Sequence, residues 1–171
     1  CLAGKTKLTA SEERGLRLFE DEKKGNCAEC HPSRPDDGKP PLFTDFTHDN
    51  LGVPRNKDLP FYELPARFDS AGEGFIDLGL GGALMRPSEN GKFRVPTLRN
   101  IAVTAPYMHN GVFWTLKDVV GFCNTRDSGK WGPPEVAENV NREELGSLKL
   151  SDAEIADLVA FMETLTDGYK G

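Results

Sequence analysis

Cys27-Ala28-Glu29-Cys30-His31 is the most informative segment of this 171-residue chain. It has the form C-x-x-C-H, which is the attachment motif of a c-type haem. The two thiols can each add to a vinyl group on one porphyrin edge, and the adjacent His31 then supplies an axial imidazole. The alternative interpretation, half of a zinc site, needs two further ligands at short spacing. The other Cys and His residues are scattered singly, which favours haem: Cys1, His48, His109 and Cys123.

The composition of the whole chain is typical of a soluble globular domain. Hydrophobic residues make up 37% of it, and no apolar run approaches the roughly 18 residues of a membrane helix. A net charge of −6 argues against a nucleic-acid partner and would suit a basic or mixed-charge redox partner. A chain of this length buries roughly 70% of its extended surface, enough for a core around a porphyrin. We therefore predict one domain over residues 1–171.

Three helices are predicted, each from a cap at its start. A capping box at residues 9–12 opens a helix that runs to about residue 19, just before the haem motif. A weaker form of the box at 115–118 opens a second helix, to residue 122 or 123. A third box at 151–154 opens the last helix, which Gly168 stops. A helix before C-x-x-C-H and a helix at the end are typical of the cytochrome c fold, so we predict an all-α, cytochrome c-like haem domain.

Between these elements the chain is irregular. Residues 32–75 are rich in Pro, Gly and Asp and show little periodicity. A loop of this length is uncommon inside a compact domain, so we expect a long loop insertion that is functional or packs over the haem edge. Gly79, Gly81 and Gly82 are interpreted as turns and not as a phosphate loop, because the G-x-G-x-x-G spacing and a preceding strand are missing.

Two longer motifs are more specific than the general cytochrome c pattern. They are Phe93-Arg94-Val95-Pro96-Thr97-Leu98-Arg99-Asn100 and Thr104-Ala105-Pro106-Tyr107-Met108-His109-Asn110-Gly111. Both closely resemble the C-terminal haem domain of the bacterial di-haem cytochrome c peroxidase and MauG-like family, and the resemblance runs from about residue 2 to 168. In that family peroxide reacts at the N-terminal haem, and the C-terminal haem stores or relays an electron. The resemblance therefore implies an electron-transfer domain that works with a redox partner protein or a second haem domain.

The residue opposite His31 is where the sequence departs from this family. The family has a Met or a Tyr near the end of the helix after the Pro-Tyr-x-His motif, and alignment without gaps places Cys123 there. Three interpretations stay open. Cys123 binds the iron as a thiolate and lowers its potential; Met108 binds the iron and Cys123 packs nearby; or the site is open and Cys123 is a small buried residue.

Other residues receive supporting roles. Arg94 and Arg99 are candidates for pairing with the haem propionates, because a guanidinium matches a carboxylate. The alternative interpretation of each is a plain surface charge, and Arg94 is the favoured candidate. The resemblance implies that His109 organises the region between two haems, although a buried histidine with satisfied hydrogen bonds is an equal interpretation. It also implies a calcium site with the carbonyls of Thr104 and Pro106, completed by an Asn of another domain.

These residues leave three functions open. The first is an electron-transfer domain. The second is a peroxide-reactive haem enzyme, for which His109 is the candidate acid or base, and the third is a redox or gas sensor in which Cys123 leaves the iron. One C-x-x-C-H motif predicts one covalent haem c. Because that haem is attached outside the cytoplasm, we expect a periplasmic or otherwise exported protein. Cys1 is consistent with a lipid anchor, with a cut through a longer polypeptide, or with a plain small residue; the resemblance favours the cut.

Overall fold

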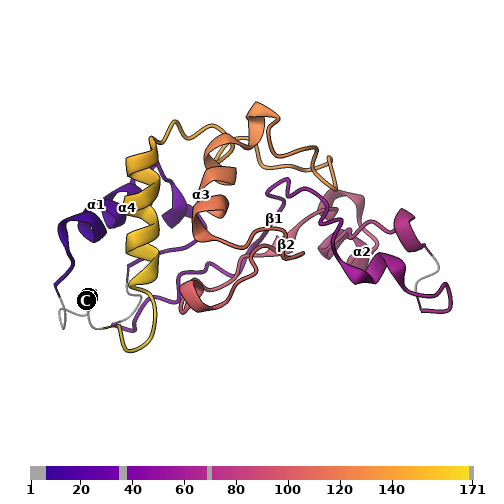
Figure 1. The fold of residues 1–171 in the computed structure, drawn as a ribbon, viewed down its shortest axis with the longest axis horizontal. Coiled ribbons are helices and arrows are strands. Elements are labelled where there is room, and N and C mark those ends of the chain that lie inside the picture. Colours follow the sequence, from indigo (N-terminus) through magenta and orange to yellow (C-terminus); the bar gives the residue numbers. More distant parts are fainter. Residues whose placement is uncertain (1–6, 35–37, 69–70, 170–171) are drawn as a thin grey trace.

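The computed structural model describes residues 7–34, 38–68 and 71–169, so Cys1 lies outside the described residues. Within these ranges the chain is mostly helical and irregular, as predicted. In Figure 1 helices α1 and α4 stand at one end, α3 in the middle, and an arm that includes α2 at the other end. The α-helices are α1 (Ala10–Glu20), α2 (Leu80–Leu84), α3 (Leu116–Thr125) and α4 (Asp152–Glu163). The 3-10 helices are η1 (Cys27–Glu29), η2 (Pro60–Glu63), η3 (Gly72–Gly74), η4 (Pro87–Glu89), η5 (Ile101–Val103) and η6 (Arg126–Ser128).

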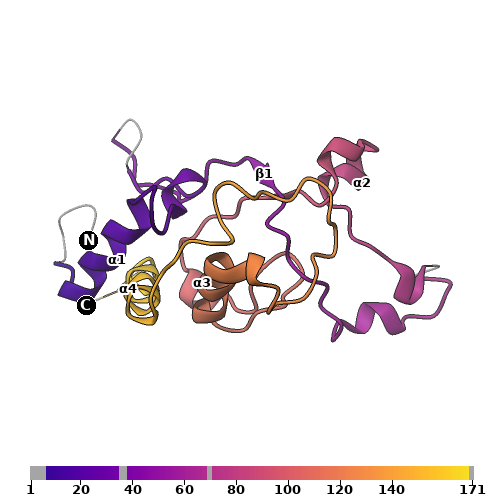
Figure 2. The ribbon, with the colours of Figure 1, turned by 90° about the horizontal axis from the view of Figure 1, so that it is seen from above.

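Helices α1 and α4 pack closely, and Figure 2 shows α4 end-on beside α1. Both begin with the capping boxes predicted from the sequence, at Thr9 and Ser151. Gly15 permits the close approach, because a Cβ at this position would lie 2.0 Å from the backbone oxygen of Asp157. The rings of Phe19 and Phe161 meet edge to face below the crossing, 5.2 Å apart. The two helices therefore make the most extensive contact between two elements of the described ranges.

Helix α3 extends two residues beyond Cys123, to Thr125, so Cys123 lies in its last turns. The Thr115 side chain accepts a hydrogen bond from the backbone N–H of Asp118 and caps the helix, as predicted. At the other end the Asn124 amide donates to the Leu150 carbonyl over 3.0 Å and accepts from the Leu150 N–H over 2.8 Å. This side chain is buried and attaches the segment before α4 to the end of α3.

The sequence did not predict the two-stranded antiparallel sheet, helix α2 or the short 3-10 helices. Strand β1 (His48–Asp49) pairs with β2 (Phe93–Arg94), so the predicted all-α class holds only in its predominance of helix. The glycines at 79, 81 and 82 were interpreted as turns, but two of them lie inside α2. Their prediction was wrong because α2 is fixed by distant contacts: a Cβ on Gly81 would lie 2.4 Å from the Asn90 backbone nitrogen.

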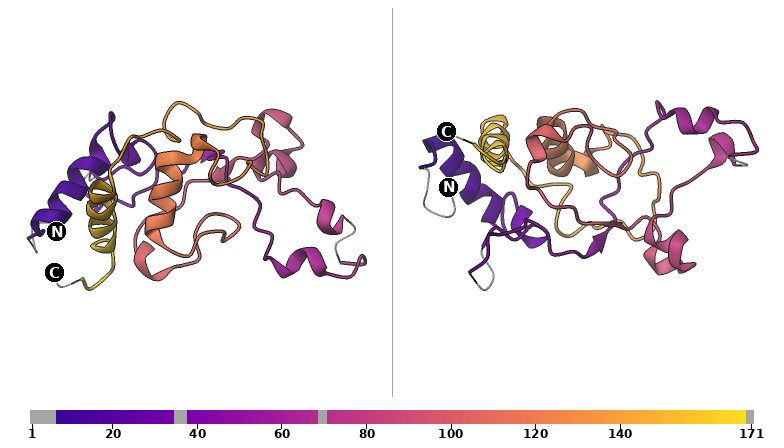
Figure 3. Two further views of the ribbon diagram at one scale, coloured as in Figure 1. Left: turned by 45° about the horizontal axis from the view of Figure 1, so that its top comes forward. Right: turned by 90° about the horizontal axis from the view of Figure 1, so that it is seen from below.

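The described part of the segment from about residue 55 to 85, residues 55–68 and 71–85, projects away from α1 and α4, and Figure 3 shows this in two further views. It contains η2, η3 and α2 and includes the later half of the loop predicted at 32–75. Several of its apolar side chains are exposed: Phe61, Leu64, Phe68, Ile76, Leu78, Leu84 and Met85. No helix in the described ranges has both the length and the apolar character needed to span a bilayer.

Candidate haem site

One cavity of about 460 Å³ brings together most of the residues singled out in the sequence. Cys27, Cys30 and His31 line it on the side of η1, and Cys123 lines it from α3. The volume lies within the roughly 300–1,000 Å³ of typical small-molecule and cofactor sites. Apolar side chains from several elements make up much of the wall: Val53, Val95, Leu98, Leu116, Val119, Val120, Leu158 and Met162. Such a wall would exclude water from a bound porphyrin.

The motif side of the cavity is built by a tight 3-10 turn. Asn26 adopts a left-handed backbone (φ 50°) ahead of the turn, and the His31 N–H donates to the Cys27 carbonyl over 2.9 Å. Both thiols are free and partly buried. Burial raises the pKa of Cys27 to about 12, with a smaller contribution from Cys123. Burial and the charge of Glu144 raise the pKa of Cys30 to about 12. Both sulfurs are therefore neutral, as they also are in the thioethers of a haem c.

His31 is held in the orientation that an axial ligand requires. Its Nδ1 lies 2.8 Å from the Phe43 carbonyl, which can only accept, so Nδ1 carries the proton. The Nε2 lone pair is then available for a metal, since the second ring nitrogen of a metal-bound histidine usually donates to such a partner. Burial lowers the pKa of His31, which favours the neutral imidazole that metal binding needs. Phe43 itself is buried and has a left-handed backbone (φ 53°).

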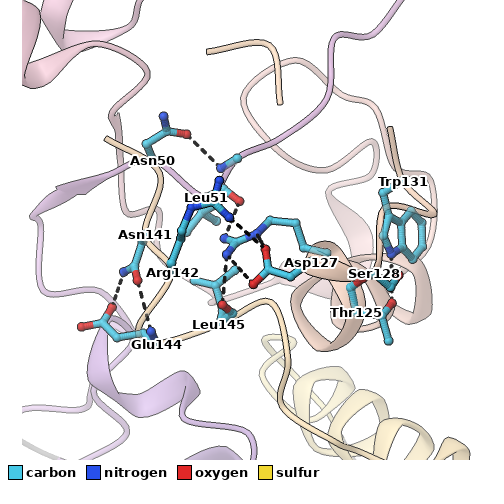
Figure 4. Close-up of polar contacts among 12 residues, drawn as sticks. Asn50, Leu51, Thr125, Asp127, Ser128, Trp131, Asn141, Arg142, Glu144 and Leu145 are labelled. Carbon is cyan, nitrogen blue, oxygen red and sulfur yellow. Dashed lines mark hydrogen bonds and ion pairs between the residues drawn. The ribbon is translucent and has the colours of Figure 1, made fainter. Parts of the chain in front are cut away.

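The α3 side of the cavity is fixed by contacts from distant segments. The Cys123 carbonyl accepts from the Gly146 N–H over 2.7 Å. Three residues further on, the buried Arg126 guanidinium donates to the carbonyls of Leu51 and Leu145, over 3.1 Å each, and pairs with Asp127 over 2.9 Å. Figure 4 labels these three partners, Leu51, Leu145 and Asp127, which lie close together. Leu51 and Leu145 also line the cavity. Arg126 therefore ties the end of α3 to two loops of the cavity wall.

The environment of Cys123 favours a neutral thiol as long as no metal ion is bound. Burial raises the pKa of this thiol to about 11, and the Arg126 guanidinium opposes the rise. A metal ion supplies the missing positive charge, because a coordinating thiol is deprotonated outright.

The structure places the remaining predicted residues in two groups. Five of them line the same cavity. All five come from the two long motifs between residues 93 and 111: Arg94, Thr104, Pro106, Met108 and His109. The His109 ring stacks on Phe93 at 3.6 Å between centroids, and burial lowers its pKa although Asp77 opposes this. The Arg94 guanidinium lies over the Phe46 ring at 5.0 Å, on an exposed side chain.

Arg99 is the exception among the predicted residues. It is exposed, does not line the cavity, and pairs with Asp167 over 2.9 Å. This ion pair links the segment after β2 to the end of α4, so the geometry gives Arg99 a partner other than a propionate. Of the two arginines predicted to bind propionates, Arg94 alone lines the cavity.

Sequence reasoning missed Glu135, which lines the cavity and has a buried carboxylate oxygen without a hydrogen-bond partner among the described residues. No local pattern marks it, because its position in the wall depends on contacts with residues 53 and 77. An unpartnered polar atom in this largely apolar wall is consistent with a cofactor that carries polar substituents. Together with two thiols, an oriented imidazole and a third sulfur, it fits a haem c.

The cytochrome c family profile matches residues 12–166 of this chain. The chain belongs to the cytochrome c family. The match covers most of α1 and all of the C-x-x-C-H motif, α3 and α4, so the predicted cytochrome c-like fold is confirmed. The family and its di-haem relatives indicate haem c as the cofactor of this cytochrome c.

The resemblance seen in the two long motifs is also confirmed. The methylamine utilization protein MauG of Paracoccus denitrificans is 38% identical over 97% of this cytochrome c and 45% of its own length. The cytochrome-c peroxidase IdrP1 of Pseudomonas sp. strain SCT is 35% identical over 95% of this chain and 41% of its own. The chain thus spans less than half the length of these relatives.

Solved structures agree with these relatives. The Y463M variant of the di-haem peroxidase BthA from Burkholderia thailandensis superposes with a TM-score of 0.79, at 36% identity, over 98% of this chain and 44% of its own. A MauG-like protein associated with microbial copper homeostasis gives a TM-score of 0.67 at 31% identity, over 96% of this chain and 49% of its own.

Proposed function

We propose that this cytochrome c carries one covalent haem and relays single electrons between a redox partner and a second redox centre, as part of a di-haem peroxidase-like or MauG-like system. The observation that carries the proposal is the single cavity shared by Cys27, Cys30, His31 and Cys123. A haem bound there would supply the one-electron chemistry, and the protein would set its potential through ligands, burial and hydrogen bonds. An exported, periplasmic location follows from haem c attachment.

In this proposal the motif side anchors the cofactor. Cys27 and Cys30 form the two thioethers, and His31 binds the iron through Nε2 while Phe43 holds its Nδ1–H. Arg94, at the cavity wall, is the partner proposed for a propionate. Calcium binding by the carbonyls of Thr104 and Pro106 stays a prediction.

Cys123 is the proposed sixth ligand. It lies on a regular helix whose end is fixed by Arg126 and Gly146, and it lines the same cavity as Cys27. A fixed soft sulfur suits iron and costs little reorganisation on redox change. Met108, the alternative, lies in a loop with a left-handed backbone (φ 68°).

The haem proposal is tested by intact mass and visible spectrum after expression with a cytochrome c maturation system. The expected mass exceeds that of the chain by one haem, and the chromophore stays with the protein in acidified organic solvent. A chromophore that washes out, or a colourless protein that binds zinc, would contradict the proposal.

The relay is tested against the enzyme alternative with hydrogen peroxide. We expect a low-spin ferric haem that is reduced reversibly by one electron and reacts slowly with peroxide, because both axial positions are filled. A high-spin ferric haem that reacts rapidly with peroxide would contradict the relay and support a peroxide-reactive enzyme.

A further inference from the structure

The carboxyl group of Glu135 is the least explained polar group of the haem cavity. Its Oε1 is buried and has no hydrogen-bond partner in the described part of the chain. A buried carboxylate without a full set of partners is costly, whereas the protonated acid is much less so. A change of charge in the cavity is therefore expected to change the protonation state of the Glu135 carboxyl group.

The backbone of Glu135 is held in place, so the side chain is kept in the wall. The Glu135 N–H donates to the Val53 carbonyl over 3.0 Å, and Pro134 forms an isolated antiparallel β-bridge with Pro54. The next carbonyl, that of the buried Val136, accepts from the Asn50 amide over 3.1 Å. These contacts belong to the wall itself, because Asn50, Val53 and Val136 line the same cavity.

Four other segments bring charged or titratable groups close to Glu135 or into the cavity wall. Burial raises the pKa of Glu135; the Asp77 backbone N–H and the Arg55 guanidinium oppose the rise, and the Asp77 carboxylate adds to it. His109, which Asp77 also influences, and Arg94 line the cavity as well. The Asp77 carboxylate already accepts from the Gly79 N–H over 2.9 Å.

We propose that Glu135 is the proton-binding site of the haem cavity: its carboxylate takes up one proton from solvent when the bound haem takes up one electron from the redox partner, and releases it on reoxidation. The inference rests on the proposed electron-transfer function. One O–H bond forms on reduction and breaks on oxidation, so the added electron and the added proton cancel in charge. Such compensation is favoured in a wall of low dielectric, where charges interact strongly.

The test is the midpoint potential of the holoprotein as a function of pH, for the wild type and for Glu135→Gln. Proton uptake on reduction makes the wild-type potential fall as pH rises. The slope approaches one proton per electron, or about 59 mV per pH unit, between the oxidised-state and reduced-state pKa values. Glu135→Gln keeps the shape of the side chain but cannot ionise, so its slope in this range is lost.

Glu138→Gln is the matched control. Glu138 is an exposed acid three positions further along the same segment and does not line the cavity, so this variant keeps the wild-type slope. A slope that persists in Glu135→Gln would assign the proton to a propionate or another group and overturn the proposal. A wild-type potential that is flat with pH would also overturn it, but would leave the haem relay intact; a protein without a reversible one-electron haem couple would fail the proposed function itself.

A second measurement covers the case in which Glu135→Gln does not take up haem. Infrared difference spectra of the wild type, reduced minus oxidised, are expected to show a carboxylic acid C=O band on reduction. Labelling the protein with ¹³C-glutamate shifts this band, whereas a propionate band would stay in place because the haem is unlabelled. A band that does not shift, or no band at all, would overturn the assignment to Glu135.

Discussion

The two walls of the haem cavity are specified in different ways. The motif wall rests on five consecutive residues, and its axial His31 is oriented by one carbonyl, that of Phe43. The α3 wall carries Cys123, whose place depends on hydrogen bonds from segments near residues 51, 146 and 150. The motif residues are therefore named by a local sequence pattern, whereas the position of Cys123, the proposed second ligand, depends on long-range packing. On the α3 wall, a single substitution is therefore expected to change the reduction potential of a bound haem.

The largest expected effect lies on the α3 wall. Replacing the thiolate of Cys123 by a thioether, in Cys123→Met, should raise the midpoint potential by on the order of 0.3 V, because a neutral ligand stabilises ferric iron less. Spectroelectrochemical titration measures it. Met108→Leu, a volume-conserving change at the same cavity, is the control and should leave the potential nearly unchanged. Equal midpoint potentials for Cys123→Met and the wild type would mean that Cys123 does not bind the iron.

The next effect breaks the helix pair beside the motif wall. Gly15→Ala places a Cβ against the Asp157 backbone, so we expect it to lower the free energy of unfolding by about 3 kcal/mol or more. Gly121→Ala, in α3, is the matched control: its Cβ would meet only the Trp131 ring, at 3.5 Å, and should stabilise the helix by about 0.5–1 kcal/mol. Denaturant unfolding of both holoproteins gives the comparison. Similar values for the two variants would contradict the close crossing of α1 and α4.

A smaller loss is expected where α3 holds the segment before α4. Asn124→Ala leaves the buried N–H and carbonyl of Leu150 without partners and should cost about 2 kcal/mol. Because Leu148 and Leu150 line the cavity, the variant should also broaden the haem absorption band. Urea unfolding followed at that band measures both. An unchanged midpoint would mean that the α3 wall does not depend on this contact.

We expect a smaller loss at the corresponding contact on the motif wall. The Thr44 hydroxyl donates to the Val95 carbonyl over 2.7 Å and accepts from the Phe46 N–H over 3.0 Å, next to the Phe43 that orients His31. Thr44→Val should cost about 1 kcal/mol and Thr44→Ser much less, since the serine keeps the hydroxyl. Urea midpoints compare the two. A serine variant as unstable as the valine variant would assign the loss to packing.

The smallest effect is a pH dependence at the helix crossing. Hydrogen bonds from Arg14 and Ser11 hold the pKa of Asp157 below its ordinary value. A lowered folded-state pKa stabilises the fold fully above the unfolded value of about 3.9, and this contribution is lost as pH falls through the folded pKa. Arg14→Gln should therefore lose more stability at pH 6 than at pH 3. The control is Arg17→Gln, on an exposed residue of the same helix, and it should show no such difference.

How much the sequence could predict follows the same division. Helices α1, α3 and α4 were predictable because each begins with a side-chain cap that is formed within four consecutive residues. Helix α2 was not, because it lacks a side-chain cap and is fixed by Asn90 and by Lys92. The motif ligands could be named from five letters, whereas Glu135 in the wall and the ion pair of Arg99 with Asp167 depend on residues far apart in the sequence.

Iron K-edge X-ray absorption of the ferric holoprotein tests the central claim most directly, because it counts the sulfur ligands of the iron. If Cys123 binds the iron opposite His31, the wild-type spectrum shows one sulfur scatterer. This scatterer is lost in Cys123→Ala and retained in Met108→Leu. A wild-type iron surrounded by nitrogen and oxygen alone, or a sulfur that persists in Cys123→Ala, would contradict the account.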